Sequence, residues 1–502
     1  MQTALYVVTV GATAACGLVV EIVAGRMLAP YLGMSLYTWT AIIAVVLAGF
    51  SLCHWVGGRI AAWSGSEAER AVAWVLLLAA LSAAASLVLL RVLSGPLLAL
   101  GLRPVASIVL LTGTVFFMPS FFVGIPSPVL TKLAIDAAPG RAGPILGRMY
   151  AAGAFGSILG TLAAGYLFIS WLGTSWTMLA VAATYAAFAA VFLVRTAGGA
   201  LRAVLLPIAV AAAAAAGLAF VGWRVQAFVS PCTEESDYYC IRIVDISSDV
   251  GAEARLMVLD HLGHGMNLRH EPGTFLSSYV ELTDVLVRAH GPAGAELNAF
   301  FVGGGAYTLP RAWARRKKAR VTVAEVDPAV TRLARQRMWL APSPRLRVVH
   351  DDARRVLRES GERYGVIVGD AFHDIAVPQH LVTREFFELV RTRLRPGGVY
   401  VMNVVDMLET PRLLLSVLRT LRTVFPVAEI WLDDEQAAAG GRATLVLLAA
   451  TKPTSAGVLR SSAFDGRVWR RWSETRLSRL AQRHPPLVLS DDFAPVDRLL
   501  GE

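Results

Sequence analysis

Long apolar stretches dominate the chain up to about residue 222, and short polar segments separate them. Seven stretches are long enough to cross a bilayer as a helix, which takes about 20 residues. They lie near 4–25, 37–57, 71–93, 104–123, 150–171, 175–194 and 203–222. Residues 124–149 contain four prolines and are expected to form a long loop or a broken re-entrant segment. The pattern predicts a transmembrane domain of about seven helices over residues 1–225.

Two features inside these stretches call for an explanation. Small residues recur at helical spacing in the fifth stretch, at Gly153, Gly156, Gly160 and Gly165. Small residues let membrane helices approach closely, so packing is favoured over a substrate path. Glu21 and His54 lie at membrane depth, where an ionisable group is costly. Structural pairing or snorkelling, with Arg26 and Arg59 nearby in the sequence, is favoured there over a transport or ligand role.

The hydrophobic period changes after Ser230. Residues 238–270 alternate apolar and polar positions, as half-buried antiparallel strands do, and predict a β-rich part over 226–295 that ends in a helix over 274–289. Strands are then expected at 298–302, 320–324, 346–349, 364–369, 399–404, 427–432 and 442–449. Helices are expected at 309–316, 328–339, 353–359, 383–394 and 409–423. This alternation predicts an α/β Rossmann-like domain over 296–502, whose ligand lies at the carboxyl ends of the strands.

Composition separates the same two halves. The 502 residues are 55% hydrophobic and only 17% charged, and nearly all Asp, Glu and Lys follow residue 222. The net charge of +10 comes mostly from arginines spread through both halves. The densest basic run, RRKK at 315–318, is interpreted as an exposed helix face. Basic loops beside anionic lipid account for the excess charge better than nucleic acid does. We expect a multi-pass plasma (inner) membrane protein that binds no nucleic acid.

The basic residues also bear on orientation. Loops after the second, fourth and sixth stretches hold Arg59, Arg70, Lys132, Arg141, Arg148, Arg195 and Arg202, and the alternate loops hold Arg26, Arg91 and Arg103. The bias places the N-terminus inside, and seven helices then place the C-terminal domain outside. One helix more or fewer reverses this result, so the side of the soluble domain stays open.

The four cysteines divide two and two. Cys16 and Cys53 lie in apolar stretches and are expected to be buried. Cys232 and Cys240 follow the last apolar stretch, and their closeness allows a disulfide on an oxidising side of the membrane or two thiols on a reducing side. None of them has the spacing of a metal site.

The strongest candidate for chemistry is NAFFVGGGAYTLPRAWARRKKARVTVAEV, residues 298–326. Gly303, Gly304 and Gly305 follow a buried strand and let the backbone turn tightly and approach a ligand. Glu325 ends the next strand, where a nucleotide-binding βαβ unit places a carboxylate for ribose hydroxyls. The alternative is a generic βα turn with a solvated acid.

Further acids follow the other strands. Asp327 follows the second strand and is expected to cap the next helix. Asp351 and Asp352 follow the third strand, and Asp370 and Asp374 follow the fourth. Several acids at one rim suit a cationic ligand. No Lys or Arg of these motifs faces that rim, which argues against a pyrophosphate such as that of NAD. Helix capping is the alternative for Asp327 and Asp351.

Several motifs of the sequence resemble those of a known family. FFVGGGAYTLPR, AEVDPAV, HDDARRVL and VGDAFHDIAVPQHLVTREFF resemble the aminopropyltransferases, the spermidine and spermine synthases. EIVAGRMLAPYLGMSLYTWT and LSDDFAPVDRLL resemble the ends of their membrane-fused relatives. The resemblance implies that decarboxylated S-adenosylmethionine donates an aminopropyl group to an amine such as a polyamine, that methylthioadenosine leaves, and that no metal takes part. Soluble relatives commonly dimerise, which implies a homodimer without deciding it.

The resemblance also implies roles for individual positions. Glu325 matches the acid that holds the ribose, and Val326 lies against the adenine. Asp352 and Ala353 match the pair at the adenine amino group. Asp370 matches the aspartate that orients and deprotonates the attacking amine. The remaining candidates are His264 near the ligand and Tyr279 and Asp374 in the substrate site.

Four departures from the family pattern put the donor and acceptor in doubt. The aspartate after the glycines is Ala306, and the usual glutamine is His264. The histidine after the tyrosine is Val280, and the paired serines after Asp370 are Ala371 and Phe372. Two alternatives therefore stay open: a methyltransferase that uses S-adenosylmethionine itself, and a polyamine transporter or sensor with a non-catalytic soluble domain.

Overall fold

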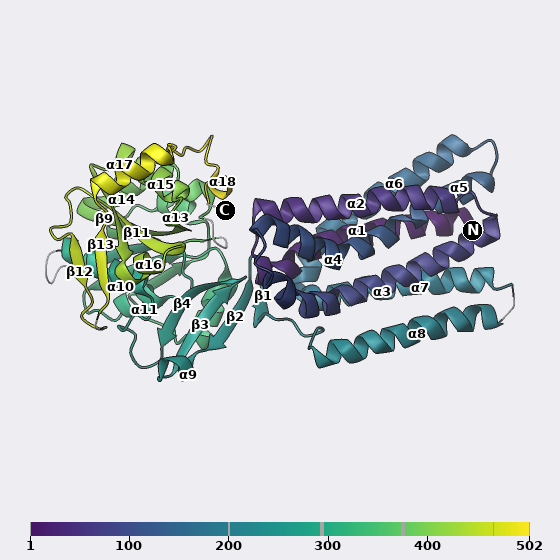
Figure 1. Cartoon of the computed structure of the whole chain (residues 1–502), viewed down its shortest axis with the longest axis horizontal. Coiled ribbons are helices and arrows are strands. Elements are labelled where there is room, and N and C mark those ends of the chain that lie inside the picture. Colours follow the sequence, from purple (N-terminus) through teal and green to yellow (C-terminus); the bar gives the residue numbers. More distant parts are fainter. Residues whose placement is uncertain (1, 199–200, 292–295, 373–376, 465, 501–502) are drawn as a thin grey trace. The chain divides into compact units, whose positions relative to one another are not determined.

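The computed structural model describes residues 2–198, 201–291, 296–372, 377–464 and 466–500. The chain divides into two compact units, Met1–Cys240 and Ile241–Glu502. The first is helical and the second is α/β (Figure 1). The segment that follows the last long helix therefore belongs to the helical unit as far as Cys240.

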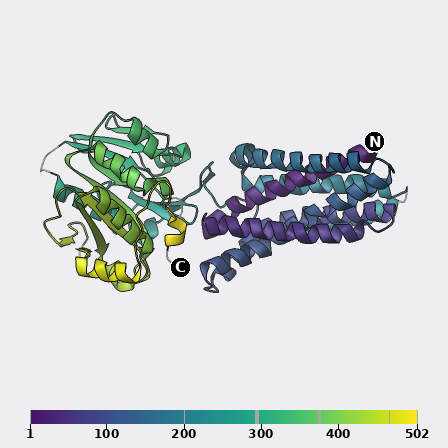
Figure 2. The ribbon, with the colours of Figure 1, turned by 90° about the horizontal axis from the view of Figure 1, so that it is seen from above.

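The helical unit is a bundle of long apolar helices (Figure 2). They are α1 (Gln2–Leu32), α2 (Leu36–Ile60), α3 (Gly65–Leu98), α4 (Pro104–Gly124), α5 (Pro126–Asp136), α6 (Ala142–Ala163), the π-helical turn η1 (Ala164–Phe168), α7 (Ile169–Thr196) and α8 (Leu201–Arg224). Helix α1 packs on α6, α2 on α4, and α3 on α7. The described residues hold six helical stretches long and apolar enough to cross a membrane.

The seven expected stretches differ from these six at one place. Residues 142–196 form a single stretch of 55 residues, which covers the fifth and sixth expectations. Gly173 breaks it with φ 75° and ψ 169°, a conformation that glycine adopts without a Cβ penalty. Of the two forms expected for 124–149, the long loop is wrong, because α5 occupies the centre and α6 begins at Ala142; the broken re-entrant segment stays a prediction. Pro126 stands at the first position of α5, where proline is tolerated.

The packing interpretation of the small residues is confirmed for two of them. A Cβ added to Gly156 would lie 2.0 Å from the Gly11 carbonyl oxygen, and one on Gly160 would lie 2.2 Å from that of Ala15. Only glycine at these positions lets α6 approach the backbone of α1 so closely.

Arg26 and Arg59, the residues expected near Glu21 and His54, make other contacts. Arg26 donates to the carbonyl oxygens of Tyr238 and Ser236, at 2.7 and 2.6 Å. Arg59 lies over the ring of Trp55, and His54 Nδ1 lies 2.5 Å from the carbonyl oxygen of Phe50. The buried acid that pairs across the bundle is Glu69, which accepts from the Tyr6 hydroxyl and lies 3.5 Å from Arg195. Which side chains pair depends on the distances between the packed helices, and these distances cannot be read from the sequence.

Beyond α8 the chain forms a short cap on the helical unit. Cys232 and Cys240 form a disulfide, the first of the two states that their spacing allowed. Glu235, in the two-residue strand β1 (Glu234–Glu235), accepts from the Thr174 N–H at 2.9 Å, next to the break at Gly173. Arg91 donates to the Val229 carbonyl oxygen at 2.7 Å. Cys16 and Cys53 are buried and free, as expected.

The α/β unit begins with β2 (Cys240–Asp245), α9 (Ser247–Val250), β3 (Ala254–Leu259), β4 (Leu262–Leu268) and α10 (Ser278–His290). Strand β3 pairs antiparallel with β2 and with β4, which confirms the β-rich part. Arg311 donates to the Leu268 carbonyl oxygen at 2.6 Å and so ties this small sheet to the main domain.

The main sheet follows in strict alternation. Its elements are β5 (Leu297–Val302), α11 (Thr308–Trp313), β6 (Ala319–Ala324), α12 (Pro328–Arg337), β7 (Leu346–Val349), α13 (Ala353–Glu359), β8 (Tyr364–Gly369), η2 (Gln379–Leu381), α14 (Arg384–Arg393), β9 (Leu394–Met407), α15 (Arg412–Val424), β10 (Val427–Asp433), α16 (Asp434–Ala439), β11 (Arg442–Ala450), β12 (Val458–Arg460), β13 (Val468–Arg471), α17 (Glu474–Arg483) and α18 (Val496–Leu499). All seven expected strands of this domain are present.

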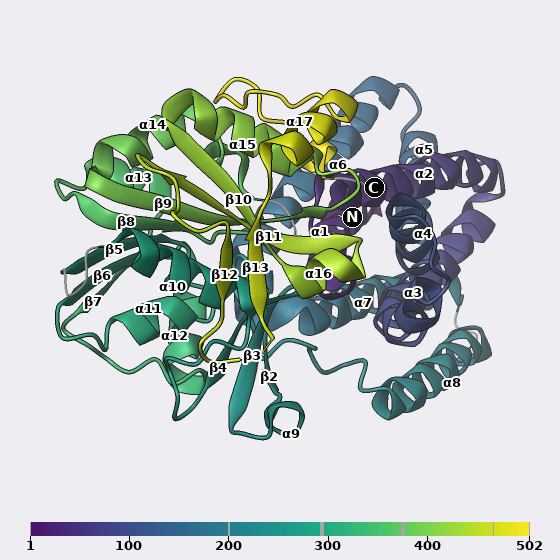
Figure 3. The same cartoon turned by 60° about the vertical axis from the view of Figure 1, so that its left-hand side comes forward.

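The strand order is β12-β13-β10-β11-β9-β8-β5-β6-β7. Strands β7, β6, β5, β8 and β9 are parallel, and the remaining neighbours pair antiparallel. Helices α10 to α12 cover one face of the sheet and α13 to α15 the other (Figure 3). The order reverses at β5, where a doubly wound sheet opens a ligand crevice. Two strands that the sequence did not predict, β13 and β12, extend the sheet beyond β10.

Candidate active site

The glycine turn lies at this reversal point. Gly303 has φ 94° and Gly305 φ 49°. A Cβ on Gly303 would lie 2.4 Å from the Asp370 carbonyl oxygen, while the Asp370 N–H donates to the Val302 carbonyl oxygen at 3.0 Å. The ends of β5 and β8 therefore touch backbone to backbone, and only glycine fits between them. The expected tight turn is confirmed, and its close approach to a ligand stays a prediction.

Glu325 is buried beneath this turn. Its carboxylate accepts from the Gly304 N–H at 2.8 Å and from the Asp327 N–H at 2.9 Å. Burial raises the pKa of Glu325, and these backbone hydrogen bonds oppose the rise. The carboxylate thus locks the glycine turn to the end of β6. Val326, next in the chain, is half-buried. The arrangement excludes a solvated strand-end acid at Glu325.

The third strand end is held by a helix cap. Asp352 accepts from the Arg355 N–H at 2.9 Å and so caps α13, and Ala353 behind it is buried. His380 Nε2 lies 2.7 Å from Asp352 Oδ2, and this hydrogen bond is the main reason why the pKa of Asp352 is lowered. Asp327 caps α12, as expected. The capping alternative offered for Asp351 is wrong, because the α13 cap is Asp352.

Asp370 follows β8 directly. Burial raises its pKa to about 6, and a hydrogen bond from the side chain of Asn403 on β9 acts in the opposite direction. Tyr279, from α10, lies close enough that the charge of Asp370 adds to the effect of burial in raising the tyrosine pKa. The two groups come from distant parts of the chain, and the fold brings them near each other; their roles toward a substrate stay predictions.

The small sheet contributes the remaining wall. A Cβ on Gly305 would lie 3.0 Å from the His264 carbonyl oxygen, and His264 Nδ1 lies 2.9 Å from that of Leu262. Ala306 is buried, and its carbonyl oxygen accepts from Asn267 Nδ2 at 2.8 Å. Asp374 lies outside the described residues.

Over the described ranges no group of three or more His, Cys, Asp or Glu side chains could hold a metal ion. The side chains described above offer carboxylates, a tyrosine hydroxyl, two imidazoles and an amide, together with backbone N–H groups. Two members were missed from the sequence, Asn403 and His380. Asn403 is a polar residue inside the apolar run VYVMNVV, and that interruption was the signal that could have found it. His380 lies in VPQHL without a comparable signal.

Residues 294–432 match the family model described as the spermine/spermidine synthase domain. This part of the chain is therefore similar to the spermine/spermidine synthase domain. The match contains the glycine turn and the ends of β5, β6, β7 and β8, whereas Tyr279 and His264 precede it.

Curated relatives match over the same region. A polyamine aminopropyltransferase of Vibrio vulnificus is 32% identical over 128 residues, 25% of this chain and 42% of the relative. A probable polyamine aminopropyl transferase of Bifidobacterium longum is 37% identical over 87 residues, 17% of this chain and 19% of the relative. The chain thus spans less than half the length of these relatives. The crystal structure of a probable spermidine synthase from Corynebacterium glutamicum aligns with 23% identity and a TM-score of 0.46, over 53% of this chain and 99% of that one.

Proposed function

We propose that this protein is a membrane-anchored aminopropyltransferase. It takes the aminopropyl group from decarboxylated S-adenosylmethionine, gives it to an amine such as a polyamine, and releases methylthioadenosine. The observation that carries the proposal is the position of Asp370, beside Tyr279 and in backbone contact with the glycine turn that Glu325 holds. The aminopropyltransferase names of the curated relatives support it.

The residues have distinct roles in the proposed reaction. Glu325 and the glycine turn hold the ribose, Val326 lies against the adenine, and Asp352 and Ala353 lie at its amino group. The amine nitrogen attacks the propyl carbon bonded to sulfur; the N–C bond forms, the C–S bond breaks, and its electron pair stays on sulfur as methylthioadenosine leaves.

Asp370 is the group that handles the proton in this step. The amine proton passes to its carboxylate, and the negative charge steadies the cation that develops on nitrogen. A pKa of about 6 leaves Asp370 ionised at neutral pH, yet close enough to neutrality to act as a base. Tyr279, whose pKa is raised, keeps its hydroxyl proton and orients the amine.

The first alternative is a methyltransferase, and one observation favours it. Ala306 presents a methyl group beside Gly265 where an acid would bind the amino group of the propylamine arm: a Cβ on Gly265 would lie 2.7 Å from the Ala306 Cβ. The carboxylate of intact S-adenosylmethionine would meet no acid from this position. The donor is therefore the first property to measure.

Incubation of the purified protein with each donor and a panel of amines, followed by mass spectrometry, tests the function. We expect methylthioadenosine only with the decarboxylated donor and only when an amine is present. S-adenosylhomocysteine from the intact donor would establish the methyltransferase instead. Binding of adenosyl ligands without either product would favour the sensor.

A polyamine transporter is the alternative that the helical unit disfavours. That unit contains a cleft of about 560 Å³, between α1, α2, α4, α5 and α6. Among the described residues that line it, the ionisable side chains are His54, Lys132 and Tyr150, and none is acidic. A path for a polycation needs acids, so the bundle is better explained as an anchor.

The proposal extends to the location of the protein. We infer a multi-pass protein of the plasma (inner) membrane whose seven helical passes place the N-terminus and the basic loops inside. Arg26, near the C-terminal end of α1, holds the segment that carries the Cys232–Cys240 disulfide. A disulfide belongs to an oxidising compartment, which here is the outer side of the membrane. The synthase domain that follows would then face outwards. A homodimer stays an expectation.

Counting thiols tests this orientation. Protein precipitated from cells with acid, which stops thiol exchange without blocking thiols, and then denatured should couple two maleimide-polyethylene glycol groups, at Cys16 and Cys53, and four after reduction. A Cys232→Ser, Cys240→Ser double variant should couple two before and after reduction. Four couplings in the unreduced wild-type protein would place the segment on the reducing side and reverse the orientation.

A further inference from the structure

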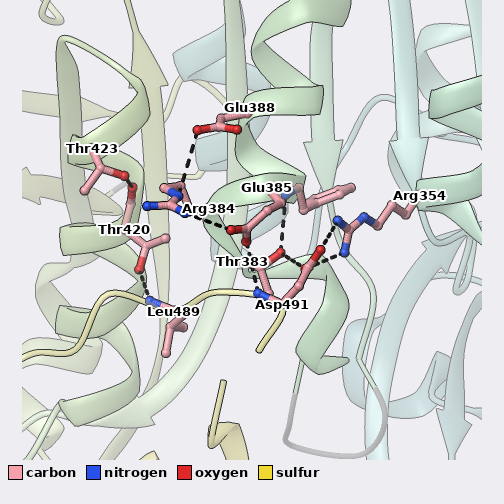
Figure 4. Close-up of polar contacts among 10 residues, drawn as sticks. Arg354, Thr383, Arg384, Glu385, Glu388, Thr420, Thr423, Leu489 and Asp491 are labelled. Atoms are coloured by element: carbon pink, nitrogen blue, oxygen red, sulfur yellow. Dashed lines mark hydrogen bonds and ion pairs between the residues drawn. The ribbon is translucent and has the colours of Figure 1, made fainter. Parts of the chain in front are cut away.

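The last segment of the chain runs along the synthase domain and is fixed to it. The Leu487 N–H donates to Ser416 Oγ at 3.1 Å, and the Leu489 N–H donates to Thr420 Oγ1 at 2.9 Å, so both bind α15. The Arg384 N–H, at the start of α14, donates to the Leu489 carbonyl oxygen at 2.8 Å (Figure 4). The motif LSDDFAPVDRLL begins at this point, and the proposed reaction assigns it no role.

Asp491 of this motif makes the densest set of contacts. Its two carboxylate oxygens accept from Arg354 Nη1 and Nη2 at 2.7 and 2.6 Å, a bidentate pair. It also accepts from the Thr383 hydroxyl at 2.7 Å, and its N–H donates to Glu385 Oε2 at 3.0 Å (Figure 4). The Arg354 hydrogen bond is the main reason why the pKa of Asp491 is lowered to about 2, so the carboxylate is charged at any working pH.

Arg354 connects this contact to the adenine side of the site. It lies on α13, directly after Asp352 and Ala353, and its Nη1 also donates to the His380 carbonyl oxygen at 3.2 Å. The His380 ring in turn holds Asp352, with Nε2 2.7 Å from Oδ2. Hydrogen bonds therefore run without a break from Asp491 through Arg354 and His380 to the acid proposed for the adenine amino group.

We propose that Asp491 is a positioning residue of the adenosyl pocket. Through Asp491 the C-terminal segment fixes the position of Asp352, and Asp352 gives the pocket its preference for a base with an amino group. The proposal rests on the proposed function, because it requires that the pocket binds adenosyl ligands. In this proposal Asp491 does not contact the ligand. It fixes Arg354, and Arg354 holds the backbone of His380 against the start of α13.

A matched pair elsewhere shows why this contact differs from an ordinary surface ion pair. Glu474, on α17, also accepts a bidentate pair, from Arg422 at 3.2 and 2.6 Å. Its side chain is 74% exposed and Arg422 37%, whereas Arg354 is only 13% exposed. Exposed ion pairs contribute little to stability. The Arg354 guanidinium is enclosed, so removing its carboxylate partner would leave its N–H donors unpaired inside the protein. Arg422 also donates to the Ala428 carbonyl oxygen at 3.3 Å, at the start of β10 and not at the carboxyl end of a strand.

The test compares Asp491→Asn with Glu474→Gln in the full-length protein. Calorimetry measures the Kd of methylthioadenosine and of methylthioinosine, which carries a carbonyl oxygen in place of the amino group. We expect Asp491→Asn to weaken methylthioadenosine binding roughly tenfold and to leave methylthioinosine nearly unchanged. The KM of the adenosyl donor should rise, while kcat and the KM of the amine should change little. Glu474→Gln should match the wild type in all of these properties.

Three outcomes overturn the inference. Equal weakening of both nucleosides by Asp491→Asn, unchanged binding of both, or the same loss in Glu474→Gln would each contradict a role at Asp352. If Asp491→Asn does not fold, Arg354→Lys, which keeps the charge but loses the bidentate geometry, must show the same loss of base preference. Failure of the wild-type protein to bind either nucleoside would instead refute the proposed function.

Discussion

Replacing Asp370 with asparagine lowers the rate of aminopropyl transfer roughly 10²- to 10⁴-fold and leaves methylthioadenosine binding close to that of the wild type. The amide cannot accept the amine proton, and it cannot steady the cation that forms on nitrogen. The hydrogen-bonding partner Asn403 and the neighbouring Tyr279 keep their places, so the loss should fall on kcat. Rapid-quench turnover and calorimetric binding on the same preparations separate the two effects.

The pH dependence follows from the same carboxyl group. Because its pKa is about 6 in the folded protein, kcat/KM should fall as the pH drops through 6. Stability changes in the opposite direction. The folded pKa is raised above the unfolded value, so the group's contribution is complete below the unfolded pKa of 3.8 and is lost as the pH rises through about 6.

Asp370→Asn should therefore stabilise the protein at pH 7, by at most about 3 kcal/mol, and have no such effect at pH 3.5. Asp434→Asn, which removes an acid paired with Arg470 on the surface, is the matched control and should change neither property. Full turnover by Asp370→Asn at pH 7.5 would show that another group takes the proton.

The second large effect is expected for Glu325→Gln. Both carboxylate oxygens of Glu325 accept from backbone N–H groups, one from Gly304 and one from Asp327. A glutamine supplies one oxygen and one NH₂ group, so one buried backbone donor loses its acceptor, at about 1–3 kcal/mol of folding free energy. The ribose loses a charged acceptor as well, and methylthioadenosine binding should weaken roughly 10- to 100-fold.

Nucleosides with altered sugars identify the source of this loss. The variant should discriminate poorly between methylthioadenosine and its 2′,3′-dideoxy analogue, whereas the wild type should prefer the ribose form strongly. Chemical denaturation of the ligand-free protein measures the folding part separately. An undiminished ribose preference in Glu325→Gln would assign the ribose to another residue and leave Glu325 as a structural support of the glycine turn.

Much of the α/β unit could be predicted from the sequence. The strands from 298 to 449 and the helices between them follow from local periodicity, because each element must bury one face whatever its neighbours are. The glycine turn was predictable for the same reason: a positive φ and a close approach leave a mark on residue choice. The extension of the sheet by β13 and β12 was not, since both strands are short and carry little apolar pattern.

Prediction was weaker wherever a contact joins distant segments. The caps show this at short range: Asp351 and Asp352 are adjacent and chemically identical, and only the φ and ψ of the helix start decide that Asp352 caps α13. Asn403 and His380 show it at long range, because nothing in their local sequence states which acids they face. The helix α5, in place of an expected loop, shows that proline at the first turn of a helix can be mistaken for a break.

The sequence by itself determined the two halves of the protein, the Rossmann alternation, the glycine turn and the identity of the acids at the strand ends. These properties are local or compositional, so hydrophobic period and backbone preference express them directly. The tertiary structure alone decided that Tyr279 lies near Asp370, that Glu325 locks the turn at Gly304, and that Asp491 is linked to Asp352. Each of these depends on the distance between segments that only the packed sheet and helices bring together. The same packing buries Asp370 and Glu325, and that burial raises the pKa of both.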